Sequence, residues 1–134
     1  GLYNEEPKWN YNFNRELMIS KTALNLSRGG PSKYSSSNRI ASLMGNGMLP
    51  FIHEKVKYQD FFDNDEIITY KNSSDLLSKL FRIKENNKLL IKRSKKAKKS
   101  YFEYFENIKI SDSMINKIFD TKKKFNYIWR KNNF

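Results

Sequence analysis

The residues best suited to chemistry gather in one loop, which lies between an apolar run and a helical pattern. Ser35, Ser36 and Ser37 supply hydroxyl donors, and Arg28 and Arg39 supply forked guanidinium groups. The start of a helix adds free backbone N–H groups and a positive dipole end, which suit a phosphate. This composition is compatible with phosphate binding, but serines that only cap the helix beside solvated arginines give the same pattern and are very common, and the chain has no P-loop or GxGxxG fingerprint.

The elements around this loop are predicted as strand, loop, helix and strand. An apolar strand is expected over Thr22–Ser27, and a Gly-Gly-Pro turn ends it. Apolar residues then recur at i, i+3 and i+4, which predicts a helix over Asn38–Gly45. Further apolar runs predict strands over Met48–His53 and Glu66–Tyr70. We therefore expect an α/β fold with a parallel sheet and right-handed crossovers, in which ligands bind beyond the carboxyl ends of the strands.

The rest of the chain is predicted to be largely helical. Helices are expected over Tyr11–Ser20, from Ser73 onward, over Asn87–Asn107 and over Ser111–Phe119. Ser73 or Ser74 is expected to cap the second of these helices. Its buried stripe is expected to contain Leu76, Leu77, Leu80 and Phe81. In the third helix the apolar side is predicted as Leu90, Ala97, Tyr101, Tyr104 and Phe105, and the basic side as Lys88, Lys92, Lys95, Lys96 and Lys99. The last helix is amphipathic through Met114, Ile115, Ile118 and Phe119.

Composition sets limits on the class of protein. The 134 residues are 38% hydrophobic and 15% aromatic, which favours a folded domain over disorder. The absence of Cys excludes disulfides and thiolate metal sites. The net charge of +12 comes from the second part of the chain, because residues 79–134 carry 17 Lys and Arg against five Asp and Glu. Aromatic residues alternate with these charges. A region of this composition is also typical of a nucleic-acid-binding module or of a surface that contacts an anionic membrane.

Two smaller features have more than one interpretation. His53 is the only histidine and ends a predicted strand, so it could act as a base or contact a sugar, or it could be an ordinary loop histidine. The segment Asp63-Asn64-Asp65 has the spacing of a DxD metal motif, but such Asp and Asn clusters also form simple turns. We expect no metal site.

Three runs of the sequence carry a resemblance to a known family. They are Ala23–Arg28, Tyr34–Ile52 and Tyr58–Phe62, within a match that covers about residues 10–107 in order. They resemble the donor-binding half of GT-B glycosyltransferases, in the "glycosyl transferases group 1" branch that includes spore-maturation-type transferases. That branch has an apolar strand, a Ser-rich loop, an Arg that opens a helix, a Gly near the helix end and a short strand with Pro. The resemblance implies a Rossmann-like sheet and a metal-independent glycosyltransferase that needs no cofactor.

The resemblance also implies roles for individual residues. It places the donor diphosphate on Ser27, Arg28, Gly29, Ser35, Ser36, Ser37 and Arg39. It assigns contacts with the sugar or ribose to Ser42, Gly47, His53 and Asp60. Ser42 stands where many GT-B enzymes have a Glu, a departure that bears on the ribose contact and on nucleotide preference.

Because GT-B catalysis takes place between two domains, the resemblance implies that this chain is a fragment that is inactive alone. Its partners would be a nucleotide sugar and an N-terminal acceptor domain of the same parent chain. We expect a partial Rossmann-like domain over residues 1–109, followed by a C-terminal helix and a basic aromatic tail over residues 110–134. The expected location is the cytoplasm, with peripheral contact to a membrane as an option.

Overall fold

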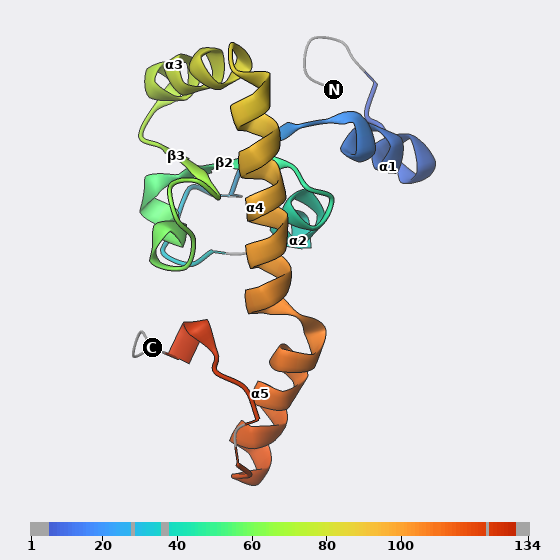
Figure 1. The fold of residues 1–134 in the computed structure, drawn as a ribbon, viewed down its shortest axis with the longest axis vertical. Helices are drawn as coiled ribbons and strands as arrows, with labels where there is room; N and C mark the ends of the chain where they lie inside the picture. Colours follow the sequence, from blue (N-terminus) through green and yellow to red (C-terminus); the bar gives the residue numbers. More distant parts are fainter. Residues whose placement is uncertain (1–5, 28, 36–37, 123, 131–134) are drawn as a thin grey trace.

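The computed structural model describes residues 6–27, 29–35, 38–122 and 124–130. In chain order the elements are α1 (Asn10–Ile19), β1 (Thr22–Asn25), α2 (Asn38–Gly45), β2 (Leu49–His53), the 3-10 turns η2 (Glu54–Val56) and η3 (Tyr58–Asp60), β3 (Ile68–Tyr70), α3 (Ser73–Lys84), α4 (Asn87–Phe105), α5 (Asn107–Phe119) and the 3-10 turn η4 (Ile128–Arg130). Figure 1 shows α3 and α5 at opposite ends of the molecule, with α4 running between them.

The three strands form one parallel sheet in the order β1-β2-β3, which confirms the expected α/β fold class. Thr22 of β1 lies opposite Leu49 of β2, and Phe51 of β2 lies opposite Ile68 of β3. β2 is the central strand and also contacts α2 and α4, and its first four residues are all buried. Pro50 is the second residue of β2, a position near the strand start where a missing N–H is tolerated.

The outer strands are shorter than the apolar runs that predict them. β1 ends at Asn25 and β3 begins at Ile68. The residues that were expected to extend these strands, Ser27 and Glu66, instead direct their side chains to partners outside the sheet, Ser35 and Ser100 respectively.

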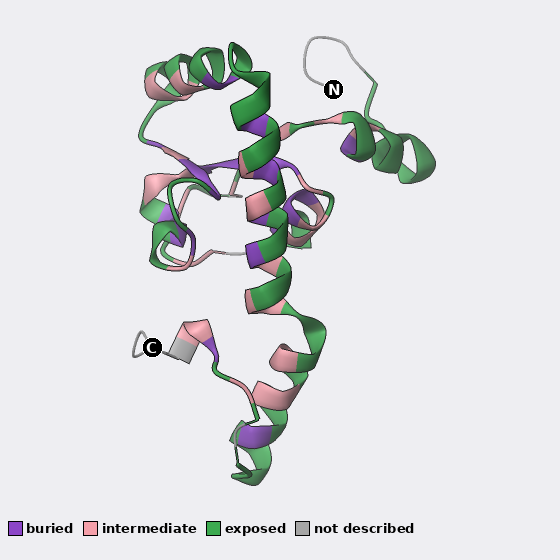
Figure 2. Ribbon diagram, viewed as in Figure 1, coloured by how far each residue is buried: buried purple, intermediate pink, exposed green. Residues whose placement is uncertain are grey.

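α4 packs along one side of the hydrophobic core. Its side toward the sheet is buried, whereas its opposite side is exposed (Figure 2). The core contributions from α2, the strands and α4 include Ile40, Met44, Leu49, Phe51, Ile52, Ile68, Tyr70, Leu90 and Ala97. This arrangement confirms the predicted apolar side of the helix.

A buried carboxylate joins the segment before β3 to α4. Glu66 is only 3% exposed; its Oε2 accepts the backbone N–H of Asp63 at 2.9 Å, and its Oε1 accepts the hydroxyl of Ser100. The ammonium group of Lys96 lies 3.1 Å from Asp63 and 3.9 Å from Glu66. The hydrogen bond that the Lys96 ammonium donates to the carboxylate of Asp63 raises the pKa of Lys96. Lys96 is therefore part of a charge cluster and not of a solvated basic face.

The prediction of a buried stripe on α3 is wrong for most of its length. Ile83 is buried, but Leu77 is 51% exposed and Phe81 is 60% exposed. α3 packs on β3 and α4 with one narrow side, from which the predicted Leu76 packs against the core, and none of the described residues covers its outer side. Its cap also differs, because the side chain of Asn72 accepts from the N–H of Asp75 at 2.9 Å, in place of the expected serine cap.

α5 begins at Asn107, four residues earlier than expected, and the predicted domain boundary after residue 109 falls inside it. Its apolar side chains are largely exposed, with Met114 at 62% and Ile118 at 72%. Only the side around Asn116 is covered, where Tyr127 of the tail packs. None of the helices in the described part of the chain combines the length and apolar composition that a membrane crossing requires.

Loss of the Glu66 carboxylate should destabilise the fold strongly. Glu66→Ala removes two hydrogen bonds to a buried charged group, each contributing roughly 1.5–3 kcal/mol, so the free energy of unfolding should fall by about 3 kcal/mol or more. Urea denaturation measures this change. Glu103→Ala, an exposed change on the same helix, is the control and should stay within about 0.5 kcal/mol. Equal effects of the two variants would contradict this role of Glu66.

The docking of the tail should depend on pH through Asp112. Its carboxylate accepts from the hydroxyl of Tyr127, from Asn116 Nδ2 at 2.8 Å and from the N–H of Lys124 at 3.4 Å. The hydrogen bond from Tyr127, together with those from Lys124 and Asn116, outweighs burial and lowers the pKa of Asp112 below its ordinary value of 3.8. Because the folded pKa is depressed, this stabilisation is present above the ordinary pKa and is lost as the pH falls through the folded pKa.

In a Trp9→Phe background, the fluorescence of Trp129 should therefore change in acid, below about pH 4. Asp112→Asn should loosen the tail already at neutral pH and remove this acid transition. An acid transition that is unchanged in Asp112→Asn would show that another group holds the tail.

Candidate functional site

The carboxyl ends of the three parallel strands lie along one edge of the sheet, where β1 ends at Asn25 and where His53 of β2 is opposite Tyr70 of β3. The imidazole of His53 meets the ring of Tyr70 edge to face at 5.3 Å, and its Nδ1 accepts the N–H of Lys55 at 3.2 Å. His53 therefore lies at the predicted carboxyl end of the strands, and its Nδ1 already accepts a hydrogen bond. In the neutral ring the other nitrogen, Nε2, then carries the proton and can donate it to a ligand.

Asn25 has an unusual environment at the same edge. Its side chain is only 4% exposed, and its Oδ1 has no hydrogen-bond partner within the part of the chain that the structure describes. Buried side-chain oxygens are normally paired, so an unpaired one at the carboxyl edge of a sheet is a feature of ligand sites.

The loop that leaves β1 turns back on itself. Gly29 and Gly30 have φ values of +72° and +103°, and a Cβ at either would meet nothing within 4 Å, so glycine is needed for its backbone freedom. The turn brings the hydroxyls of Ser27 and Ser35 to 3.3 Å from each other. Ser27 and Ser35, two residues predicted to donate hydrogen bonds to a phosphate, are eight residues apart in the sequence. In the structure their hydroxyls lie next to each other.

Arg39, in the first turn of α2, is hydrogen-bonded to the start of this loop. Its Nη1 donates to the carbonyl oxygen of Leu26 at 2.6 Å. The described residues offer its remaining N–H groups no partner, so the guanidinium can hold the loop and bind an anion at the same time. Of the other predicted residues, Arg28, Ser36 and Ser37 lie outside the described residues.

Tyr34 links the loop to the connection between β2 and β3. Its φ is +56°, its N–H donates to the carbonyl of Val56 at 2.8 Å, and its hydroxyl donates to Asp60 Oδ2 at 2.6 Å. This hydrogen bond is the main reason that the pKa of Tyr34 is raised. Asp60, predicted as a sugar contact, is therefore beside the loop, although one of its oxygens already accepts from Tyr34.

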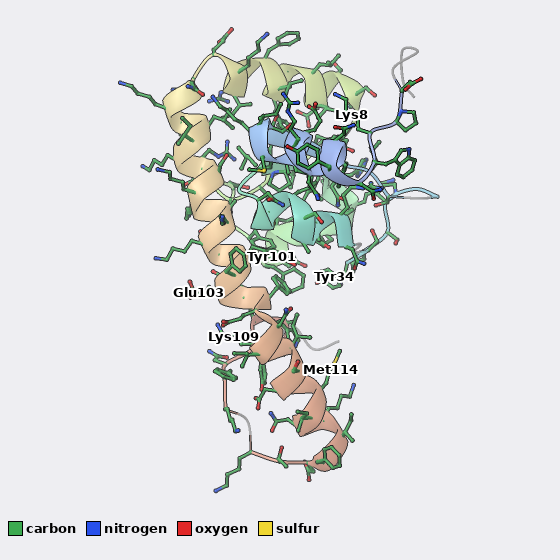
Figure 3. All side chains as sticks on the ribbon, turned by 90° about the vertical axis from the view of Figure 1, so that its right-hand side faces the viewer. Lys8, Tyr34, Tyr101, Glu103, Lys109 and Met114 are labelled. Atoms are coloured by element: carbon green, nitrogen blue, oxygen red, sulfur yellow. The ribbon has the colours of Figure 1, made fainter. Side chains whose placement is uncertain are left out.

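A pocket of about 210 Å³ opens next to this link. Figure 3 shows Tyr34 and Tyr101 near one another, at the level where α4 passes the loop. The ring of Tyr34 lies 5.2 Å from that of Phe61, which meets Phe105 of α4 at 6.1 Å. The pocket is lined by Tyr34, Ile40, Tyr58, Phe61, Phe62, Tyr101 and Phe105. Aromatic walls of this kind suit a planar ring.

Two predicted residues make contacts that do not involve the loop. The hydroxyl of Ser42 donates to the carbonyl of Asn38 within its own helix at 3.2 Å. Gly47 has a φ of +79° and lies beyond the far end of α2, a helix of eight residues that spans about 12 Å. A Cβ at Gly47 would lie 3.6 Å from Lys98 of α4, so the structure gives Gly47 a turn and a packing role at its position.

A second pocket, of about 390 Å³, lies beside the free edge of β3 and includes basic side chains. Lys79 there donates to the carbonyl of Thr69 at 2.8 Å, and Arg93 donates to the carbonyl of Ile67 at 3.0 Å. These two cations satisfy carbonyl groups near the edge strand, which also blocks the pairing of a further strand there.

The contacts that complete the candidate site join residues that are distant in the sequence. Nothing in the residue spacing predicts Asn25, the Tyr34–Asp60 pair or the aromatic pocket. A partial signal is present in the cluster of Tyr58, Phe61 and Phe62, which is unusually aromatic for a connection between strands.

Comparison with known proteins places the chain in a family. The sequence model of a family described as glycosyl transferase-like matches residues 2–114 of the 134. A search of curated proteins and a search of solved structures each gave no significant match. The parallel sheet with flanking helices fits the C-terminal half of a GT-B enzyme. Since the family match covers most of the sequence, the chain belongs to the glycosyl transferase-like family.

Proposed function

We propose that this chain is the donor-binding half of a nucleotide-sugar-dependent glycosyltransferase, and that the loop between Ser27 and Arg39 holds the donor diphosphate. The observation that carries the proposal is the convergence of three features at the carboxyl edge of the sheet. The hydroxyls of Ser27 and Ser35 are 3.3 Å apart, the N-terminus of α2 follows, and Arg39 projects from its first turn. Hydroxyls, helix amides and a guanidinium are the donors that phosphate oxygens accept best.

In this proposal the chemistry of the site is electrostatic. When the bond between the sugar and the diphosphate breaks, negative charge develops on the leaving diphosphate, and Arg39 with the dipole of α2 stabilises it. These groups take the place of a metal ion, so the proposal assigns no metal to the site. His53 would donate from Nε2 to a sugar hydroxyl, and the unpaired Oδ1 of Asn25 would accept from the donor.

The aromatic pocket gives the donor's ring a place near the diphosphate. Its lining is almost wholly apolar, and Tyr34 forms part of both the pocket and the loop. A nucleobase stacked there would leave its diphosphate within reach of the same loop. We assign the remaining predicted contacts, Ser42 and Gly47, no direct part in the diphosphate site.

The acceptor side is assigned to another domain. In GT-B enzymes the reaction takes place between two domains, so we propose that the catalytic base and the acceptor site belong to an N-terminal domain of a longer parent chain. By itself the present chain would then bind the donor weakly and would not turn it over.

The alternative of a nucleic-acid-binding module needs aromatic side chains that are free to stack on bases. Tyr104 and Phe105 instead pack against the core, and Trp129 stacks on Phe105 at 5.6 Å. The positions of these three rings favour a packing role for them, whereas Phe102 and Phe119 of the same region are 51% and 69% exposed.

Arg39→Ala should weaken binding of UDP or GDP. The guanidinium supplies a charge-assisted hydrogen bond worth roughly 1.5–3 kcal/mol, which corresponds to about tenfold to hundredfold in the dissociation constant. Arg39→Lys should recover only part of the loss, because one ammonium cannot hold both the Leu26 carbonyl and a phosphate. Isothermal titration calorimetry of the longer parent chain with each nucleotide measures the effect.

Arg15→Ala, which removes an exposed arginine from α1, is the matched control and should bind as the parent does. Arg28→Ala tests the second predicted arginine. Unchanged affinity in Arg28→Ala and Arg39→Ala alike would mean that the diphosphate does not bind at this loop.

Tyr34→Phe should loosen the loop while leaving the pocket filled by a ring of the same size. The variant loses the hydroxyl that donates to Asp60, so its melting temperature without ligand should fall and nucleotide affinity should fall with it. Tyr11→Phe, at a tyrosine that is 78% exposed, is the control. If Tyr34→Phe melts at a lower temperature but binds UDP and GDP like the parent, the Tyr34–Asp60 hydrogen bond stabilises the loop without contributing to nucleotide binding. That result would contradict this part of the proposal.

A further inference from the structure

The tail after α5 runs back toward the level at which α4 ends (Figure 1). Two of its aromatic residues attach it there. Tyr127 is only 2% exposed, and its hydroxyl donates to the carboxylate of Asp112 in α5. The ring of Tyr127 stacks on that of Trp129 at 5.4 Å. Trp129 in turn stacks on Phe105, the last residue of α4, at 5.6 Å with 18° between the ring planes. A series of stacked rings therefore joins the tail to the end of α4.

Phe105 borders two cavities. It lines the aromatic pocket of about 210 Å³, and it also lines a cavity of about 170 Å³ whose other walls come from α5 and from Trp129. Trp129 is not among the residues that line the aromatic pocket. Phe105 is only half-buried, and there is free space on its α5 side. Close packing by the core therefore does not by itself fix the position of this ring.

Contacts with other rings hold Phe105 in its place. Phe61 meets it edge to face at 6.1 Å, and Phe62 lies 5.8 Å from it. Tyr101, one turn earlier in α4, stacks on it at 5.6 Å. These three rings line the aromatic pocket themselves, whereas Trp129 contacts Phe105 from outside that pocket. Without the indole of Trp129, the ring of Phe105 could move toward the cavity on the α5 side.

We infer that Trp129 is a positioning residue for donor binding, because it holds Phe105 in place as a wall of the pocket that receives the donor's base. The inference rests on the proposed function, in which a nucleobase stacks in the aromatic pocket. Aromatic rings attract one another only in certain relative orientations, so a displaced Phe105 would bind the base less well. The diphosphate binds at the loop between Ser27 and Arg39, and its affinity should not depend on Trp129.

Calorimetry of the longer parent chain with UDP and with inorganic pyrophosphate tests the inference, because pyrophosphate has no base. Trp129→Leu should weaken UDP binding by roughly threefold to tenfold, the usual contribution of one aromatic contact, and should leave pyrophosphate binding unchanged. Trp129→Phe keeps a ring that can stack on Phe105, so it should retain most of the affinity for UDP. Trp9→Leu, at a tryptophan that is 74% exposed, is the matched control and should bind both compounds normally.

Two results of this experiment would overturn the inference alone. If Trp129→Leu binds UDP with the affinity of the unsubstituted protein, Trp129 does not position the pocket wall. If Trp129→Leu weakens UDP and pyrophosphate equally, the tail acts through the fold as a whole and not through the pocket. Failure of the unsubstituted protein to bind UDP is a separate result, because it would overturn the proposed function and this inference together.

Asp112→Ala tests the same series of contacts from its far end. Asp112 does not line the aromatic pocket, but its carboxylate accepts the hydroxyl of Tyr127, which stacks on Trp129. The variant should therefore weaken UDP binding and leave pyrophosphate binding unchanged, and its loss should not add to that of Trp129→Leu in the double variant. Glu103→Ala removes an exposed carboxylate two residues before Phe105 and is the control. Fully additive losses would mean that Asp112 does not act through Trp129, and would contradict the inferred series of contacts.

The fluorescence of Trp129 provides a direct signal. The chain has two tryptophans, so in a Trp9→Phe background the emission comes from Trp129 alone. Saturating UDP should change this emission, because a base in the pocket contacts the same Phe105 ring on which Trp129 stacks. Pyrophosphate should leave the emission unchanged. Emission that does not respond to saturating UDP, or that responds equally to pyrophosphate, would overturn the inferred link between the tail and the base pocket.

Discussion

The parallel pairing of β1 with β2 determines where the loop after β1 and the start of α2 lie. Because these strands run in the same direction, the chain that leaves β1 must cross over the sheet before it enters β2, and α2 makes that crossover. The carboxyl ends of the strands then share one edge, and the N-terminus of α2 faces the loop that leaves β1. The phosphate site that we propose is a consequence of this topology.

The loop itself is held by a small number of polar contacts and not by burial. Arg39 holds the carbonyl of Leu26, and Tyr34 holds both the backbone of Val56 and the carboxylate of Asp60. A loop of this kind can adjust to a ligand without cost to the core, whose centre is the buried strand β2. Binding residues on a loop that a buried sheet positions are common in proteins.

The local elements could be predicted from the sequence because each has a local signal. The strand-loop-helix-strand order and the bounds of α2 follow from apolar spacing, and the helical second half follows from the 3.6-residue period. Periodicity shows that a helix has an apolar side, but not whether another element covers it. For this reason Leu77 and Phe81 of α3 were expected to be buried and are exposed.

The candidate site was predictable only in part. Ser27, Ser35 and Arg39 lie close together, as their place between a strand and a helix suggests. The Tyr34–Asp60 contact spans 26 residues and depends on a positive φ at Tyr34, for which a single sequence has no signal. Gly47 was expected near the sugar, but the length of α2 places it at the other end of that helix.

Amide chemical shifts measured during a UDP titration of the isotope-labelled chain test whether the donor diphosphate binds at the loop after β1. Weak binding is sufficient for this measurement. We expect the largest shift changes at the amides of Ser27, Ser35 and the first turn of α2 from Asn38 to Ile40. Changes centred instead on the basic pocket of Lys79, Arg82 and Arg93, or no changes at saturating UDP and GDP, would contradict it.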